Sequence, residues 1–137
     1  MNTTENLKNI FPKGEKMPAE YFTGNVWMKL LVPADTILNC QIANDVFEPG
    51  ARNYWHTHPG GQILIVTDGI GYYQERGKPI KTIRKGDVVT ILPDLEHWHG
   101  ASPDSEFTHI AVNSNIQNGK IVVWLSRVTD DEYYGRT

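Results

Sequence analysis

The sequence has a single cysteine and no long apolar run. Cys40 can form no internal disulfide, and no thiolate cluster is available to bind a metal. The longest strongly apolar run, residues 63–66, is far too short to span a bilayer. Residues 1–11 are polar and lack the apolar centre of a signal peptide. We therefore expect a soluble, cytoplasmic protein with no membrane partner.

The sequence also lacks a strong excess of either basic or acidic residues. The chain carries 13 basic and 16 acidic residues, for a net charge of -3, and the basic residues are scattered. This distribution gives no electrostatic footprint for nucleic acid or for an anionic membrane. The length of 137 residues, with 39% hydrophobic residues, suits one domain with a buried core. We predict a single domain over residues 21–137, preceded by a polar arm over residues 1–20.

Short β-prone runs, separated by turn residues, fill the chain from about Gly24 onward. The predicted strands are residues 25–32, 39–47, 62–67, 71–74, 80–83, 87–92, 106–113 and 120–127. Many short strands at this spacing are typical of an antiparallel sandwich or barrel, so the predicted class is all-β. One short helix is predicted at the C-terminus, where Thr129 and Glu132 have the spacing of a capping box.

Four of the five histidines form two pairs with i, i+2 spacing, His56 with His58 and His97 with His99. Alternate side chains of an extended segment point to the same face, so each pair can offer two imidazoles to one site. Imidazole is the commonest protein ligand of transition metals. After a bend at residues 59–61, Gln62 can turn inward as well. The histidine pairs therefore predict a site for one divalent transition metal.

The segments around these residues resemble the two sequence motifs of the cupins. Gly50-x5-His56-x-His58-x3-Gln62-x6-Gly69 is similar to the first motif, and Gly86, Pro93 and His97 are similar to the second. The resemblance implies a double-stranded β-helix, a jelly-roll barrel that holds the metal in its mouth. It also implies that the metal ligands are His56, His58, Gln62 and His97.

A closer resemblance is to small bacterial cupins that include the manganese-dependent hydroxynitrile lyases. It runs from about residue 20 to the C-terminus and includes residues 47–51, 55–59, 97–100 and 108–109. It implies manganese as the metal, although iron, nickel, cobalt or zinc also suit such ligands. It further implies a small-molecule substrate, a homodimer or homotetramer, and His109 as the general base.

The implied ligand set is uncharged and leaves a divalent metal with its full double charge. Such a metal is a stronger Lewis acid than one with a carboxylate ligand. We predict a metal-dependent enzyme acting on a small oxygenated metabolite, with a hydroxynitrile lyase-like C–C lyase as the first hypothesis. The alternatives are a dioxygenase, isomerase or decarboxylase, or a cupin that binds a small ligand without catalysis.

Four further side chains have two interpretations each. His109 either acts as the base, for which a near-neutral pKa is suited, or packs inside the barrel. His99, the second catalytic candidate, either lines the pocket or orients a ligand or a water molecule. Asp45 faces either the pocket or solvent. Arg52 either binds a substrate carboxylate or lies on the surface.

Overall fold

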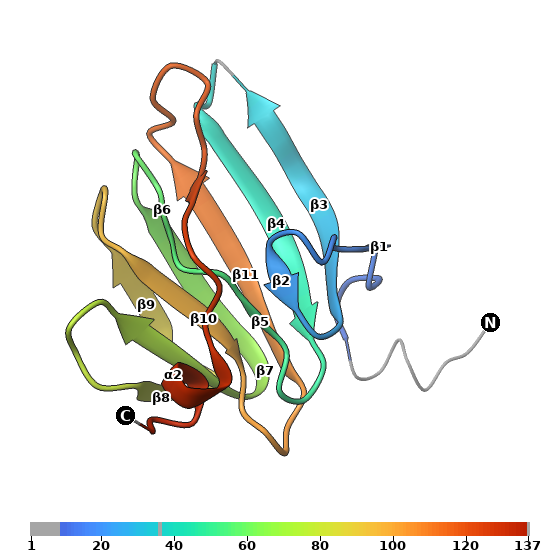
Figure 1. Ribbon diagram of the computed structural model, residues 1–137. Helices are drawn as coiled ribbons and strands as arrows, with labels where there is room; N and C mark the ends of the chain where they lie inside the picture. The colour runs from blue at the N-terminus through green and yellow to red at the C-terminus, as the bar shows by residue number, and fades with distance from the viewer. Residues whose placement is uncertain (1–8, 36, 137) are drawn as a thin grey trace.

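The computed structural model describes residues 9–35 and 37–136, and almost all of its regular structure is β (Figure 1). The strands are β1 (Glu15–Lys16), β2 (Phe22–Thr23), β3 (Val26–Asp35), β4 (Cys40–Phe47), β5 (Arg52–Asn53), β6 (His56–Thr57), β7 (Gln62–Glu75), β8 (Lys81–Arg84), β9 (Val88–Ile91), β10 (His97–Ala101), β11 (Phe107–Ser114) and β12 (Val123–Trp124). The one helix among the described residues is α2 (Asp130–Tyr133). No helix in residues 9–35 or 37–136 is long and apolar enough to cross a membrane.

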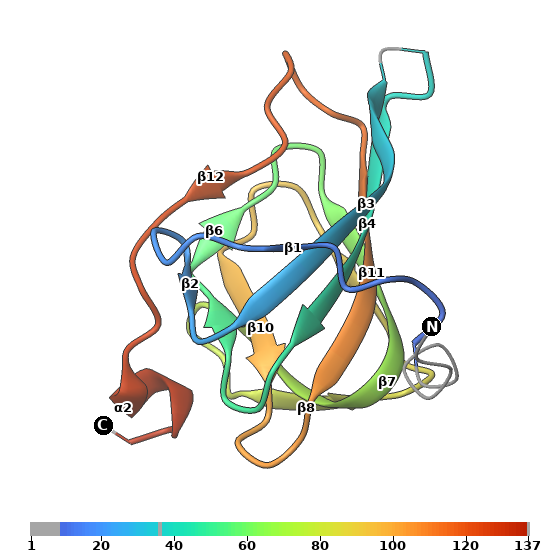
Figure 2. The same ribbon diagram turned by 90° about the vertical axis from the view of Figure 1, so that its right-hand side faces the viewer.

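All strand pairs are antiparallel, and the long strand β7 joins the two sides of the barrel. Its first half pairs with β11 and β9, and its second half pairs with β10 and β8. The main strand order is β1-β3-β4-β11-β7-β10-β5-β2, with β6 and β12 extending from β10. Figure 2 shows β4, β11 and β7 along one side of the barrel and β6 and β10 on the other. This arrangement confirms the predicted all-β jelly roll, a double-stranded β-helix.

The predicted break at Asp68-Gly69 does not interrupt the sheet. The two strands predicted over residues 62–67 and 71–74 are one continuous strand, β7. Gly69 adopts a φ of 78° opposite Phe107. A Cβ at Gly69 would collide with the carbonyl oxygen of Glu106, so only glycine fits there. The register with β11 shifts at Thr67, because Thr108 lies opposite Asp68 and His109 lies opposite Val66. Strand β7 therefore continues through this bulge and through Gly69 without ending.

Two further differences concern the C-terminal half. β10 was not predicted as a strand, because all five of its residues are buried and it shows no alternation of polar and apolar side chains. The strand predicted over residues 120–127 is reduced to β12, which pairs only with β6. At the other end of the chain, β1 pairs with β3 and attaches residues 15–16 of the predicted arm to the barrel.

The core consists of two hydrophobic clusters. The larger cluster lies inside the barrel and consists of Val26, Phe47, Ala51, Leu64, Val66, Tyr73, Ile83, Ile91, Ala101, Phe107 and Ala111. The smaller cluster joins the outer side of β10 to the C-terminal segment and consists of Trp55, Trp98, Val128 and Tyr133. In β11 the buried residues alternate with half-buried ones from His109 onward, which places polar and apolar side chains together on the inner face.

The predicted helix and its capping box are confirmed. Thr129 Oγ1 accepts a hydrogen bond from the Glu132 N–H (3.1 Å), and Glu132 Oε1 accepts one from the Thr129 N–H (3.0 Å). Arg52, which is 5% exposed, holds this segment by donating to Asp130 Oδ1 (2.7 Å) and to the Val128 carbonyl (3.0 Å). The interpretation of Arg52 as a surface residue is therefore wrong, because its side chain is buried and paired with Asp130.

We expect Tyr133→Phe to lower the free energy of unfolding by about 1–2 kcal/mol. The buried Tyr133 hydroxyl donates to the Ala101 carbonyl, and the substitution leaves that acceptor without its partner. Tyr134→Phe is the matched control, because Tyr134 is 54% exposed. Urea denaturation measures both variants. Equal stabilities for the two variants would contradict this role of Tyr133.

Candidate metal and active site

Three strands bring the predicted ligands together at the mouth of the barrel. His56 begins β6 and His97 begins β10, and the two residues lie directly opposite each other in the antiparallel pair. Their ring centroids are 4.2 Å apart, and the His58 ring lies 4.9 Å from His56 and 5.5 Å from His97. Gln62 begins β7 and lines the same cavity as His56 and His58. All four side chains are buried.

A backbone carbonyl fixes the orientation of each of these three imidazoles. The Nδ1 bonds run from His56 to Tyr54 O (2.7 Å), from His58 to Ile121 O (2.8 Å) and from His97 to Leu95 O (2.8 Å). A carbonyl oxygen can only accept, so each Nδ1 carries the hydrogen and each Nε2 keeps its lone pair. Within the described residues, His58 Nε2 and His97 Nε2 are buried and have no hydrogen-bond partner. Buried, unpartnered acceptors of this kind suit a cation.

A chain of side-chain amides orients Gln62. Its Nε2 donates to Asn113 Oδ1 (3.0 Å), and Asn113 Nδ2 donates to Gln41 Oε1 (3.1 Å). The chain crosses β7, β11 and β4. Because Nε2 is committed to Asn113, the atom left over is Oε1, which is buried and has no partner among the described residues. Gln62 therefore adds a third unpartnered acceptor to those of His58 and His97.

His99 lies beside this group and has partners of its own. Possible ligand atoms of His56, His97 and His99 all lie within 4.8 Å of one another, and in the described residues this is the one group of histidine, cysteine or acidic side chains close enough to hold a metal ion; His58 does not belong to it. However, His99 Nδ1 is 3.1 Å from His109 Nε2, and the Asn53 amide is 3.2–3.3 Å from the His99 ring nitrogens. Asn53 Oδ1 also accepts from the His99 backbone N–H (2.9 Å). Asn53 and His109 thus hold His99 in place.

The fully buried His109 lies behind His99. Its ring contacts Phe47 and Phe107, with centroid distances of 5.2 and 5.3 Å. It does not belong to the residues that line the cavity, whereas His99 does. On its other side, His109 Nδ1 lies 3.7 Å from Asp45 Oδ2. His109 can therefore reach a molecule in the cavity only through its neighbours.

The cavity at the mouth of the barrel has a volume of about 100 Å³. It is lined by Phe22, Met28, Gln41, Ala43, Asp45, Phe47, Asn53, His56, His58, Gln62, His99, Ala111, Asn113, Ile121, Val122 and Trp124. Asp45 thus faces the cavity and is the one carboxylate among its described lining residues. Pockets for drug-sized ligands are several times larger, so this cavity suits a small molecule.

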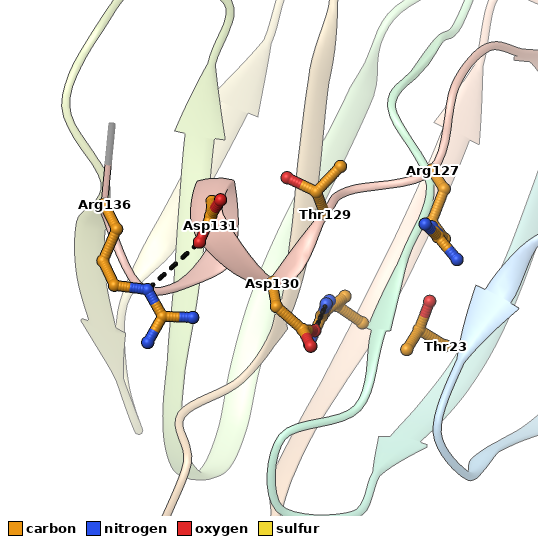
Figure 3. Close-up of a pocket in the computed structure, with 7 residues that line it drawn as sticks. Thr23, Arg127, Thr129, Asp130, Asp131 and Arg136 are labelled. Atoms are coloured by element: carbon orange, nitrogen blue, oxygen red, sulfur yellow. Dashed lines mark hydrogen bonds and ion pairs between the residues drawn. The ribbon is translucent and has the colours of Figure 1, made fainter.

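A larger hollow of about 440 Å³ lies on the surface beside α2 (Figure 3). Its Arg136 is paired with Asp131 (3.2 Å), and its Arg52 is paired with Asp130 (2.7 Å). Two of its three arginines are thus already neutralised by aspartates. The hollow is a weaker candidate site than the cavity, beside which buried polar atoms have no partner in the described part of the chain.

Sequence analysis did not identify Asn53, Gln41 or Asn113 as polar residues of the site. Asn53 reaches His99 because its neighbour Arg52 pairs with Gly100, across β5 and β10. Gln41 and Asn113 are directly opposite each other across β4 and β11. These contacts depend on which strands pair and in which register. A local sequence pattern therefore cannot predict these contacts.

Burial controls the protonation of the site. It lowers the pKa of His58 and His97 to about 4 and that of His109 to about 3. Burial likewise lowers the pKa of His56 and His99 well below 6.5. These histidines are neutral at neutral pH, as a metal ligand must be. Burial has the opposite effect on Asp45, because it raises the pKa of this carboxyl to about 7.

We expect the metal-free protein to lose stability as the pH falls from about 6.5 to about 4. In this range the unfolded histidines, with a pKa of 6.5, take up protons that the buried ones, such as His58, do not. The raised pKa of Asp45 gives the opposite slope between 3.8 and about 7, but one carboxyl opposes five histidines. Urea denaturation at several pH values measures the effect. Stability that stays constant or rises on acidification would contradict it.

Comparisons with known proteins agree with this architecture. The model of the Cupin domain matches residues 45–112. The (R)-mandelonitrile lyase of Granulicella tundricola is 46% identical over 118 residues, which are 86% of this chain and 89% of that protein. A cupin-like protein of Thermotoga maritima superimposes with a TM-score of 0.90 at 51% identity, over 95% of this chain and 98% of that chain.

A predicted oxalate decarboxylase of Thermotoga maritima shares the fold at 21% identity. Its TM-score is 0.65, over 81% of this chain and 91% of that chain. At this identity the similarity concerns the fold and not the reaction. The sequence match, the curated relative and the jelly-roll fold lead to one conclusion. The chain belongs to the cupin family.

Proposed function

We propose that this cupin is a metal-dependent lyase that cleaves the C–C bond of a cyanohydrin or a similar α-hydroxy compound. The observation that carries the proposal is the group of buried acceptor atoms that have no hydrogen-bond partner among the described residues, beside a small cavity that is lined by His99 and backed by His109. The 46% identity to an (R)-mandelonitrile lyase supports the same reaction class.

We propose His56, His58, Gln62 and His97 as the ligands of one divalent transition metal. In support, Nδ1 of each histidine is bonded to a carbonyl, and Gln62 Nε2 is bonded to Asn113, so four acceptor atoms are left. His99 is left out of the ligand set because its ring already contacts Asn53 and His109. Manganese is the first candidate, and iron, nickel, cobalt and zinc are alternatives.

The remaining polar side chains at the cavity would accept the substrate hydroxyl proton and return it to the leaving group. When bound, a divalent metal with neutral ligands supplies a Lewis acid that stabilises negative charge on a substrate oxygen or a departing anion. The substrate hydroxyl loses its proton to the His99–His109 pair, with His109 as the base. The C–C bond to cyanide breaks as the carbonyl forms. The proton returns to cyanide, so the products are an aldehyde and hydrogen cyanide.

The apolar wall of the cavity suits the apolar part of such a substrate. Phe22, Phe47 and Trp124 contribute aromatic surface, and Ala43 and Ala111 leave space. The small volume favours a compact molecule with one polar group directed toward the histidines.

We expect the untagged protein, reloaded with manganese, to contain about one metal per chain and to release benzaldehyde from mandelonitrile. His58→Ala should lose both metal and turnover. His109→Ala should keep the metal and lose turnover by at least about 100-fold, as removal of a general base does. Metal analysis by mass spectrometry and an absorbance assay for benzaldehyde measure the two properties. Full turnover in His109→Ala would contradict the role of this histidine.

We expect Asn113→Leu to weaken metal binding by about 10-fold or more, because Gln62 loses the partner that orients its amide. Asn113→Asp should restore affinity, since an aspartate oxygen can still accept from Gln62 Nε2. Ser114→Ala is the control, because this neighbouring residue on β11 does not line the cavity. Competition with a chromophoric chelator measures the affinities. Equal affinities for all three variants would show that Gln62 is not a ligand held by this amide chain.

A further inference from the structure

We propose that Asp45 is a positioning residue for His109. Its carboxylate holds the hydrogen of His109 on Nδ1, so that Nε2 of His109 is the atom that accepts a proton delivered by His99. The three residues then form an array, Asp45–His109–His99, that opens to the cavity at both ends. This inference deepens the proposed function and rests on it for its role in catalysis, but not for the structure of the array.

The geometry of the array begins with strand register. Asp45 on β4 and His109 on β11 are directly opposite each other in an antiparallel pair. Asp45 Oδ2 lies 3.7 Å from His109 Nδ1, which is slightly longer than a hydrogen bond. The terminal torsion of a carboxylate is soft, so a small rotation of Asp45 can close this gap. Catalytic hydrogen bonds are often long before a substrate is bound.

Both facing groups have unfulfilled hydrogen-bonding capacity. His109 Nδ1 and Asp45 Oδ1 are buried, and neither has a hydrogen-bond partner among the described residues. A buried polar atom without a partner is costly in free energy, by about 1–3 kcal/mol. A hydrogen bond between the Asp45 carboxylate and His109 Nδ1–H would remove this cost for the imidazole.

The contact with His99 makes the tautomer of His109 a choice between two states. One hydrogen lies between His109 Nε2 and His99 Nδ1, which are 3.1 Å apart. If His109 supplies it, His109 Nδ1 is a bare lone pair facing the Asp45 carboxylate, which is repulsive. If His99 supplies it, His109 carries its own hydrogen on Nδ1, which faces Asp45 Oδ2 at 3.7 Å, and the Asn53 amide donates to His99 Nε2 (3.3 Å). An ionised Asp45 therefore selects the Nδ1–H tautomer.

With its hydrogen held on Nδ1, His109 offers the lone pair of Nε2 to His99 Nδ1, which is 3.1 Å away. A proton that leaves His99 Nδ1 then binds to His109 Nε2, and the positive charge on His109 faces the Asp45 carboxylate. Asp45 thereby orients His109 and stabilises its charged form, while His109 remains the base.

Few other titratable groups face this array. On the strands that flank it, Met28 of β3 lies opposite Asp45 and Val66 of β7 lies opposite His109, and neither side chain titrates. The other described titratable residues beside the array are His56 and His58, which line the cavity, and His97, whose ring stacks on His99 with the centroids 5.7 Å apart. Burial keeps all three neutral near pH 7. A pH-dependent change of the His109 tautomer would thus report on Asp45.

Nitrogen-15 NMR of the histidine rings tests the array directly, on the full chain both metal-free and loaded with diamagnetic zinc. We expect His109 to be the Nδ1–H tautomer above the pKa of Asp45 and the Nε2–H tautomer below it. In metal-free protein the change should be centred near pH 7, and zinc should shift it to lower pH because a dication favours the carboxylate. An Nε2–H tautomer at every pH in the wild type would overturn the proposal.

Variants of Asp45 provide the comparison. Asp45→Asn should abolish the pH-dependent change of tautomer, and Asp45→Glu should retain it. Asp68→Asn changes the net charge by the same amount outside the cavity and should behave as the wild type. A tautomer change that persists in Asp45→Asn would overturn the proposal. Asp45→Glu is a second test that does not depend on whether Asp45→Asn folds.

Kinetics separates this inference from the proposed function. We expect Asp45→Asn to lower kcat for the cyanohydrin by about 10-fold to 100-fold at equal metal content, and Asp68→Asn to leave it unchanged. An unaltered kcat and pH profile in Asp45→Asn would overturn the role of Asp45. If the wild type cleaves no cyanohydrin, the proposed function fails, while the NMR result still decides whether Asp45 sets the tautomer of His109.

Discussion

The hydrogen bonds from three backbone carbonyls to histidine Nδ1 atoms determine what this site can do. The carbonyls of Tyr54, Leu95 and Ile121 place the hydrogen of each imidazole on Nδ1, so that each Nε2 keeps its lone pair. Each carbonyl belongs to a segment next to a barrel strand, and its position depends on the whole sheet. The barrel thus determines the tautomer of the three proposed ligands as well as their position.

The polar groups at the mouth of the barrel lower the free energy of unfolding, because their burial is unfavourable. Below it, apolar side chains such as Leu64 and Phe107 fill the interior and are fully buried. At the mouth, the barrel instead buries five histidines and three amides around a small cavity, and the half-buried carboxylate of Asp45 lines that cavity. Several of their polar atoms have no partner within the described part of the chain, and desolvation shifts their pKa values. Such unfavourable burial is expected where a protein binds a cation or moves a proton.

The fold class and the pairing of His56 with His58 were predictable, because both depend on local patterns of spacing. The set of four proposed ligands came instead from the resemblance to the cupin motifs. Features that depend on strand pairing were not predictable. β10 is buried on both faces and shows no alternation, and Arg52 is a buried anchor only because the C-terminal segment folds back onto it. The orientation of Asp45 was likewise decided by its register with His109.

We propose that one metal ion binds at the buried acceptor atoms of His56, His58, Gln62 and His97. Anomalous scattering from a crystal of the untagged, manganese-reloaded protein, measured on both sides of the manganese absorption edge, tests it most directly. The account predicts a single strong peak bonded to Nε2 of His56, His58 and His97 and to Oε1 of Gln62. A peak between His56, His97 and His99, or no peak in fully reloaded protein, would contradict it.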